Sequence, residues 1–73
     1  MDVGMLWLDS DRQRSFDEKV NRAAEYYLEK YGRSPELCLV NTQSLSEKKK
    51  VGQIEVQPVR TVSPHHFWLG MKA

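Results

Sequence analysis

The stretch from residue 15 to residue 32, SFDEKVNRAAEYYLEKYG, decides the fold of this chain. Seven apolar side chains recur in it at helical spacing and, at 100° per residue, fall within an arc of about 140°. They are Phe16, Val20, Ala23, Ala24, Tyr27, Leu28 and Tyr31. The pattern predicts one amphipathic helix whose apolar stripe faces a core.

Both ends of this helix are marked by the residues around them. Ser15 stands three residues before Glu18, the spacing at which each side chain can bond a free amide at a helix start. Gly32 can adopt the left-handed conformation that ends a helix, and Pro35 prevents its continuation. We therefore expect the helix to begin after Ser15 and to end at Gly32.

The segments around the helix carry the patterns of strands. Residues 5–8 and 37–40 are apolar runs, and a strand, a helix and a strand with short connections favour a right-handed crossover with parallel strands. Alternating residues at 53–57 and 67–71 predict two further strands, expected to form an antiparallel hairpin, with Pro58 favouring an edge position. The predicted fold is α+β, in the order β-α-β-β-β, with a four-stranded mixed sheet and one helix on one face.

Length and composition favour one small intracellular domain. At 73 residues the chain has room for a single core, and we expect residues 42–50 to be a mobile polar loop. A lone Cys38 allows no internal disulfide, which favours a reducing compartment. The acidic Asp2 and the short apolar stretch after it argue against a secretion signal, and no run is long enough to span a membrane. We therefore expect a cytoplasmic protein.

One helix can cover only one face of a sheet, so some apolar side chains need another cover. The candidates for the second face are Trp7, Cys38, Val40 and Trp68. Exposing three or four of them would forfeit roughly 5 to 10 kcal/mol, comparable with the roughly 4 to 11 kcal/mol of total stability at this length.

A curled hairpin, the 42–50 loop or another protein chain could cover this face. We favour a second chain, either in a homodimer or as another protein, contacting Trp7, Trp68 and Val40. The alternative is that both tryptophans complete an intramolecular core. The leading hypothesis is a non-enzymatic protein-interaction module without a cofactor.

Two other functions are open. The net charge is only +1, but a lysine-rich loop beside a sheet bearing aromatics can bind nucleic acid. The residues proposed for that role are Lys48, Lys49, Lys50 and Arg60. A small metal-dependent hydrolase would instead require Asp9, Asp11 and one of the adjacent histidines, His65 or His66, to converge. Asp9 and Asp11 are also typical turn formers, and no CxxC or HxxxH spacing is present, so no metal site is expected.

Two segments resemble a group of short uncharacterised bacterial proteins. They are YGRSP at residues 31–35, with Leu37 and Cys38 directly beyond, and PHHFWLG at residues 64–70. The resemblance implies a bacterial origin and brings no activity, cofactor or catalytic residue with it.

Overall fold

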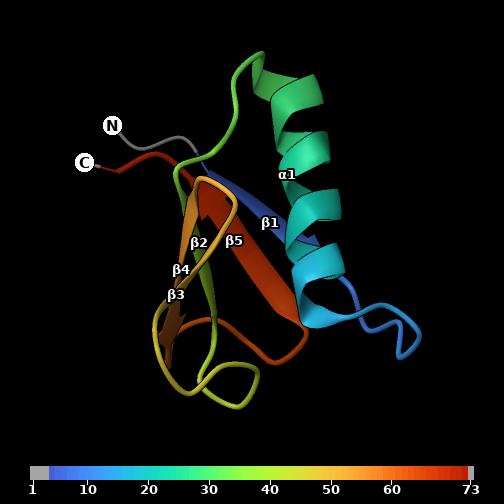
Figure 1. Cartoon of the computed structure of the whole chain (residues 1–73), viewed down its shortest axis with the longest axis vertical. Helices are drawn as coiled ribbons and strands as arrows, with labels where there is room; N and C mark the ends of the chain where they lie inside the picture. Colours follow the sequence, from blue (N-terminus) through green and yellow to red (C-terminus); the bar gives the residue numbers. More distant parts are fainter. Residues whose placement is uncertain (1–3, 73) are drawn as a thin grey trace.

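A computed structural model describes residues 4–72, and in it α1 (Phe16–Tyr31) packs on one face of a mixed β-sheet (Figure 1). Residues 1–3 and 73, which belong to the predicted domain, lie outside the described residues. The caps are those predicted. Ser15 Oγ accepts the N–H of Glu18 at 3.2 Å, and the Glu18 carboxylate accepts the N–H of Ser15 at 3.0 Å. Gly32 has φ 77° and donates its N–H to the carbonyl of Leu28 at 2.8 Å, so the helix ends there.

The buried stripe of α1 is narrower than the predicted one. Val20, Ala23 and Tyr27 are buried, and they fall within about 60° of the helix circumference. Leu28 lies at the margin of the predicted stripe and is 46% exposed. The sheet is therefore contacted mainly along one line of the helix, and Leu28 contributes little to the core.

Within residues 4–72 the sheet has five strands, one more than predicted, in the order β1-β5-β2-β4-β3. The strands are β1 (Gly4–Leu8), β2 (Leu37–Asn41), β3 (Lys49–Val51), β4 (Ile54–Val59) and β5 (His66–Gly70). The additional strand is β3, which occupies part of the predicted 42–50 loop and pairs antiparallel with β4 through a turn at Gly52, φ 61°.

The predicted hairpin between the last two strands is wrong. β5 lies between β1 and β2 and is antiparallel to both, whereas β4 lies on the other side of β2 and is parallel to it. The parallel orientation of β1 and β2 is as predicted, but β5 separates them. β5 therefore has a neighbouring strand on each side, and its Phe67 and Leu69 side chains are buried in the core. Pro58 lies in β4 beyond the end of β3, where β4 pairs with β2 and, among the described strands, with no other.

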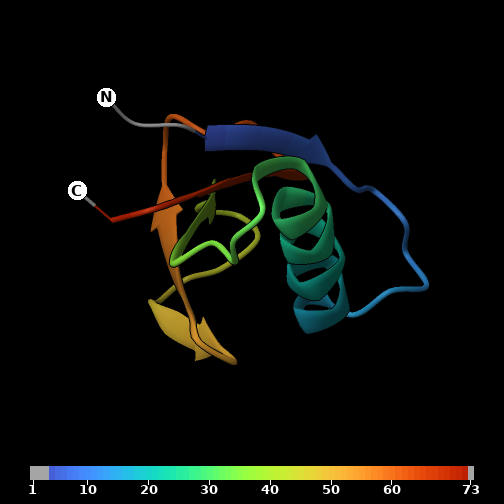
Figure 2. The same ribbon diagram turned by 90° about the horizontal axis from the view of Figure 1, so that it is seen from above.

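Figure 2 shows from above that α1 lies against one face of the sheet. The core lies between the two. Its buried members come from every element: Met5, Val20, Ala23, Tyr27, Cys38, Val40, Val51, Ile54, Val56, Phe67 and Leu69. Leu45, from the connection between β2 and β3, packs against the same cluster. Among residues 4–72, no helix is both long and apolar enough to cross a membrane.

Burial makes the Cys38 thiol unreactive. The side chain is completely buried, and burial raises its pKa to about 12. The thiolate is the nucleophile in disulfide exchange. At neutral pH we therefore expect a disulfide reagent to modify Cys38 in the folded chain only as fast as the protein unfolds locally around it. In the denatured chain, modification should be complete within the mixing time. Following the release of the coloured thiol of the reagent tests this. Modification of the folded chain at the denatured rate would contradict the burial of Cys38.

Candidate functional site

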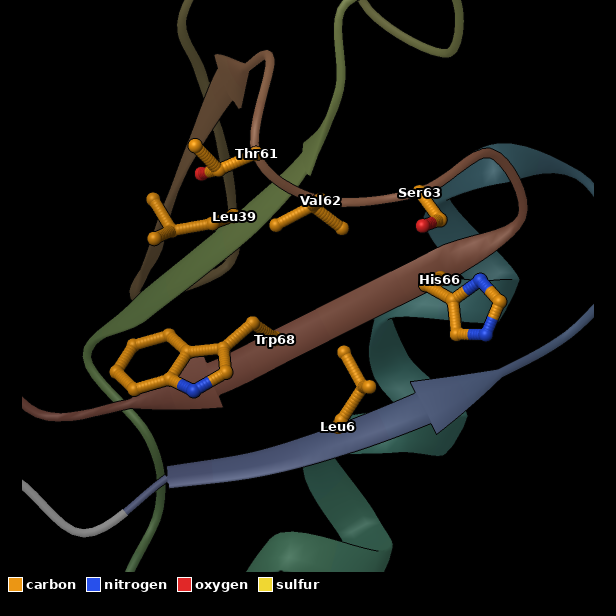
Figure 3. Close-up of a pocket in the computed structure, with 7 residues that line it drawn as sticks. All are labelled: Leu6, Leu39, Thr61, Val62, Ser63, His66 and Trp68. Carbon is orange, nitrogen blue, oxygen red and sulfur yellow. The ribbon is translucent and has the colours of Figure 1, made fainter.

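The face of the sheet away from α1 carries an apolar hollow of about 370 Å³. Figure 3 shows its lining, which comes from β1, β2, β5 and the β4–β5 connection: Leu6, Leu39, Thr61, Val62, Ser63, His66 and Trp68. Because side chains alternate along a strand, Leu6 and Trp68 point away from the helix, while Met5 and Leu69 point toward it. We call the surface formed by Leu6, Leu39, His66 and Trp68 the open face.

Trp68 is seated on two glycines. Gly4 and Gly70 are paired across β1 and β5, and a Cβ atom on either would lie well inside van der Waals contact of the indole ring. The ring therefore occupies the space above both backbones. A side chain with so large a flat surface against the sheet loses little further freedom when it is contacted from outside, which suits a binding anchor.

Two of the three predicted interface residues lie on the other face. Val40 is 0% exposed and belongs to the core beneath α1. Trp7 also faces the helix, where its ring stacks on Tyr26 with centroids 4.4 Å apart. Trp68 alone of the three is on the open face. The candidate face assignment was thus wrong for Trp7, Cys38 and Val40, because a run apolar at every position does not reveal which side chains face the helix.

The chain covers part of the open face itself. Val62 is buried, and its carbonyl accepts a hydrogen bond from Asn41 Nδ2 at 2.8 Å, which ties the β4–β5 connection to the end of β2. The β2–β3 connection instead sends Leu45 to the core. Leu6 and Leu8 remain 62% and 59% exposed, the largest exposures among the exposed large apolar residues. Intramolecular cover is therefore incomplete on the β1 side.

The lysines proposed for nucleic acid do not share one surface. Lys49 Nζ is 2.9 Å from Asp17 Oδ1 on α1, so this side chain is on the helix side. Lys50 is the next residue of β3 and lies opposite Glu55 in β4. Lys48 precedes β3, and Arg60 follows β4 in an exposed turn. Because side chains alternate along β3, Lys49 and Lys50 point to opposite faces of the sheet. Each has an acidic residue nearby, Asp17 for Lys49 and Glu55 for Lys50.

Asp9 and Asp11 form a hydrogen-bonded turn. Asp9 Oδ1 accepts the N–H of Asp11 at 3.0 Å, and Arg14 lies 3.4 Å from Asp9 and 3.0 Å from Asp11. Asp9 also donates its N–H to the carbonyl of His65 at 3.0 Å. The two aspartates are thus held by backbone amides and by a guanidinium, as turn residues are.

The histidines belong to the turn before β5. His65 has φ 66°, a conformation unusual for a residue with a side chain. The Nδ1 atom of His66 lies 2.9 Å from the carbonyl oxygen of Pro64, and His66 lines one end of the hollow (Figure 3). Within residues 4–72, no group of three or more His, Cys, Asp or Glu side chains is placed to hold a metal ion.

A polar cluster borders the open face on the β4 side. Lys72 Nζ is 2.9 Å from Glu55 Oε1, and Gln57 Nε2 donates to the other oxygen of Glu55. These bonds, that to Lys72 first, lower the pKa of Glu55 from its usual 4.5. The open face therefore combines an apolar half over β1, β5 and β2 with a charged border.

The lowered pKa of Glu55 predicts a pH dependence. Because its pKa is lower in the folded chain, Glu55 stabilises the fold above its unfolded pKa, and this contribution is lost as the pH falls through the folded pKa. We expect Lys72→Met to reduce the loss of stability on acidification, and Arg33→Met, at an exposed position, to leave it unchanged. Urea unfolding at several values between about pH 6 and about pH 3 measures this. Equal acid sensitivity of wild type and Lys72→Met would contradict it.

Sequence reasoning found Trp68 but missed the other residues of the hollow. Leu6 and Leu39 sit within apolar runs whose register is ambiguous, and residues 61–63 reach the hollow only through the path of the β4–β5 connection. His66 carried one usable signal, because it is two residues before Trp68 in the same strand and therefore shares its face. A comparison with models of protein families found no match for this chain, and neither curated proteins nor solved structures matched it.

Proposed function

We propose that this chain is a protein-binding module and that its contact surface is the open face. The observation that carries the proposal is the position of Trp68, which lies flat over Gly4 and Gly70 beside an apolar hollow. Tryptophan anchors dominate many protein interfaces because they bury a large surface at a small cost in side-chain entropy. The hollow fits an aliphatic or aromatic side chain of the partner.

The surroundings of the hollow favour a protein over a nucleic acid. Its wall includes Leu6, Leu39 and Val62, whereas Glu55, the charged residue of β4, pairs with Lys72 and lies opposite Lys50. Binding of a phosphate backbone relies on cationic side chains that neutralise its charges. Lys49 is instead paired with Asp17, and Lys50 lies opposite Glu55. An apolar centre with a charged border is the arrangement of protein interfaces.

The cellular setting that we propose is the reducing cytoplasm of a bacterium. Cys38 is a free buried thiol, which fits a reducing compartment. The bacterial assignment rests on the resemblance of residues 31–35 and 64–70 to short bacterial proteins.

Site-specific photo-crosslinking tests the proposal. A benzophenone amino acid at Thr61, which is exposed at the rim of the hollow, reports on contacts with the open face. The matched control carries the same group at Leu28, exposed on α1. We expect a discrete adduct with a protein of the native lysate at position 61 and none at position 28. The adduct at position 61 should be lost in Trp68→Ala. The circular dichroism of that variant verifies that it is folded. Equal adducts at both positions, or an adduct indifferent to Trp68→Ala, would overturn the proposal.

A further inference from the structure

The two edges of the sheet differ in their protection against pairing with another strand. β3 forms one edge and is protected, because it is three residues long and contains Lys49 and Lys50. β1 forms the other edge, is five residues long and consists of apolar residues and a glycine. Long apolar edge strands pair readily with other chains, so β1 is the edge at which an added strand is expected.

The backbone groups of β1 that point outward can be identified from the register. Asp9 donates its N–H to the carbonyl of His65, so the odd-numbered residues of β1 bond to β5. The N–H and C=O groups of Gly4, Leu6 and Leu8 therefore point to the free edge. Tyr31 Oη donates to the Gly4 carbonyl at 3.2 Å, as this orientation requires. Among residues 4–72, the outward groups of Leu6 and Leu8 have no hydrogen-bond partner.

We propose that β1 pairs antiparallel with β1 of a second copy of this chain, about a two-fold axis at Leu6. An isologous pair needs outward-pointing residues opposite one another, and centring on Leu6 places Gly4 opposite Leu8 at both ends. Leu6 then bonds to its own copy through both backbone groups. Leu8 N–H reaches the second lone pair of the Gly4 carbonyl, which already accepts from Tyr31 Oη. The two sheets join into one of ten strands. The pairing uses the edge of the sheet, so it goes beyond the proposed function and can fail independently of it.

The side chains on both faces of β1 fit this register. On the open face, Leu6 meets Leu6 of the second copy. Leu8 lies opposite Gly4 of the second copy, which is covered by the Trp68 indole of that copy. On the helix side, Met5 lies opposite Trp7 of the second copy. A hollow of about 430 Å³ beside the edge, lined on the α1 side by Tyr26, Glu29 and Lys30, leaves room for the added strand.

Sedimentation of wild type and two lysine variants tests the pairing. Leu8 is at the edge and outside the lining of the open-face hollow, so Leu8→Lys affects the edge and spares the hollow. We expect wild type to approach twice the monomer mass across the micromolar range and Leu8→Lys to weaken association about a hundredfold, tenfold at each of two equivalent sites. Leu28→Lys, exposed on α1, is expected to associate like wild type. A monomeric wild type, or equal association of Leu8→Lys, overturns the pairing.

Two backbone measurements separate edge pairing from any other dimer. We expect hydrogen exchange at the amides of Leu6 and Leu8 to slow as concentration rises, because both donate across the two-fold axis. N-methylation of Leu6 by chemical synthesis keeps every side chain and removes one donor from each copy, and it should weaken association while leaving the urea unfolding of the monomer unchanged. N-methylation of Arg12, in an exposed loop, is the control. A dimer with fast exchange at Leu6 and Leu8 overturns the pairing, whereas the Thr61 adduct reports on the open face alone.

Discussion

Replacing Leu69 by alanine is expected to lower the free energy of unfolding by about 3 kcal/mol. Leu69 is 0% exposed and lies in β5 opposite Met5 of β1 and Cys38 of β2. The surrounding strands are held by their hydrogen bonds, so they cannot close around the space that the missing carbons leave. This loss is a large part of the roughly 4 to 11 kcal/mol of stability expected for the chain. Urea unfolding followed by circular dichroism measures it.

Leu28→Ala is the matched control for this experiment. It removes the same atoms from a residue that is 46% exposed on α1, and alanine is the better helix former. We expect a change within about 0.5 kcal/mol. Equal losses for the two variants would mean that the core does not lie between α1 and the sheet at Leu69.

Gly70→Ala is expected to destabilise the fold by about 1 to 3 kcal/mol, although it adds a single methyl group. That methyl group would enter the space of the Trp68 indole, which lies over Gly70 and Gly4. The ring would have to lift off the sheet, because the backbone beneath it is paired on both sides. Trp68 fluorescence should shift to longer wavelength at the same time, as the indole enters water.

A double-mutant cycle with Trp68→Ala isolates this contact. Without the indole, the methyl group of Gly70→Ala meets no obstacle, and alanine is about 0.5 kcal/mol or more better than glycine within a strand. We therefore expect the destabilisation to disappear, or to become a small gain in stability, in the Trp68→Ala background, with a coupling free energy of about 1.5 to 3.5 kcal/mol. Additive effects of the two substitutions would show that the ring does not rest on Gly70.

The helix could be predicted almost completely because its signals are local. Ser15, Glu18 and Gly32 act within one turn of the positions that they mark, so the sequence alone determines where α1 begins and ends. β3 escaped prediction because Lys49 and Lys50 are typical of loops, and only pairing with β4 makes that segment a strand. Strand order is likewise non-local, since β5 pairs with β1 and β2, which lie far from it in the sequence.

The open face was predicted in kind and misplaced in detail. One helix leaves one face of the sheet uncovered, and Leu6 and Trp68 lie on that face. Trp7, Cys38 and Val40 were expected there as well, but they face the helix. β1 and β2 are apolar on both sides, so their pattern has no polar member to fix the register. Asp9, directly after β1, is polar but buried. A polar residue at a strand end therefore does not reliably mark the exposed face.

The place of β5 in the sheet has a consequence for synthesis on the ribosome. β1 and β2 bond to β5, the last of the described strands to be synthesised, so neither can pair on that side until β5 has left the ribosome. Until then α1 has no complete surface to pack on, and the apolar segments 5–8 and 37–40 stay open to chaperones. We expect folding in one late step, at the slower rates of proteins whose contacts join distant segments.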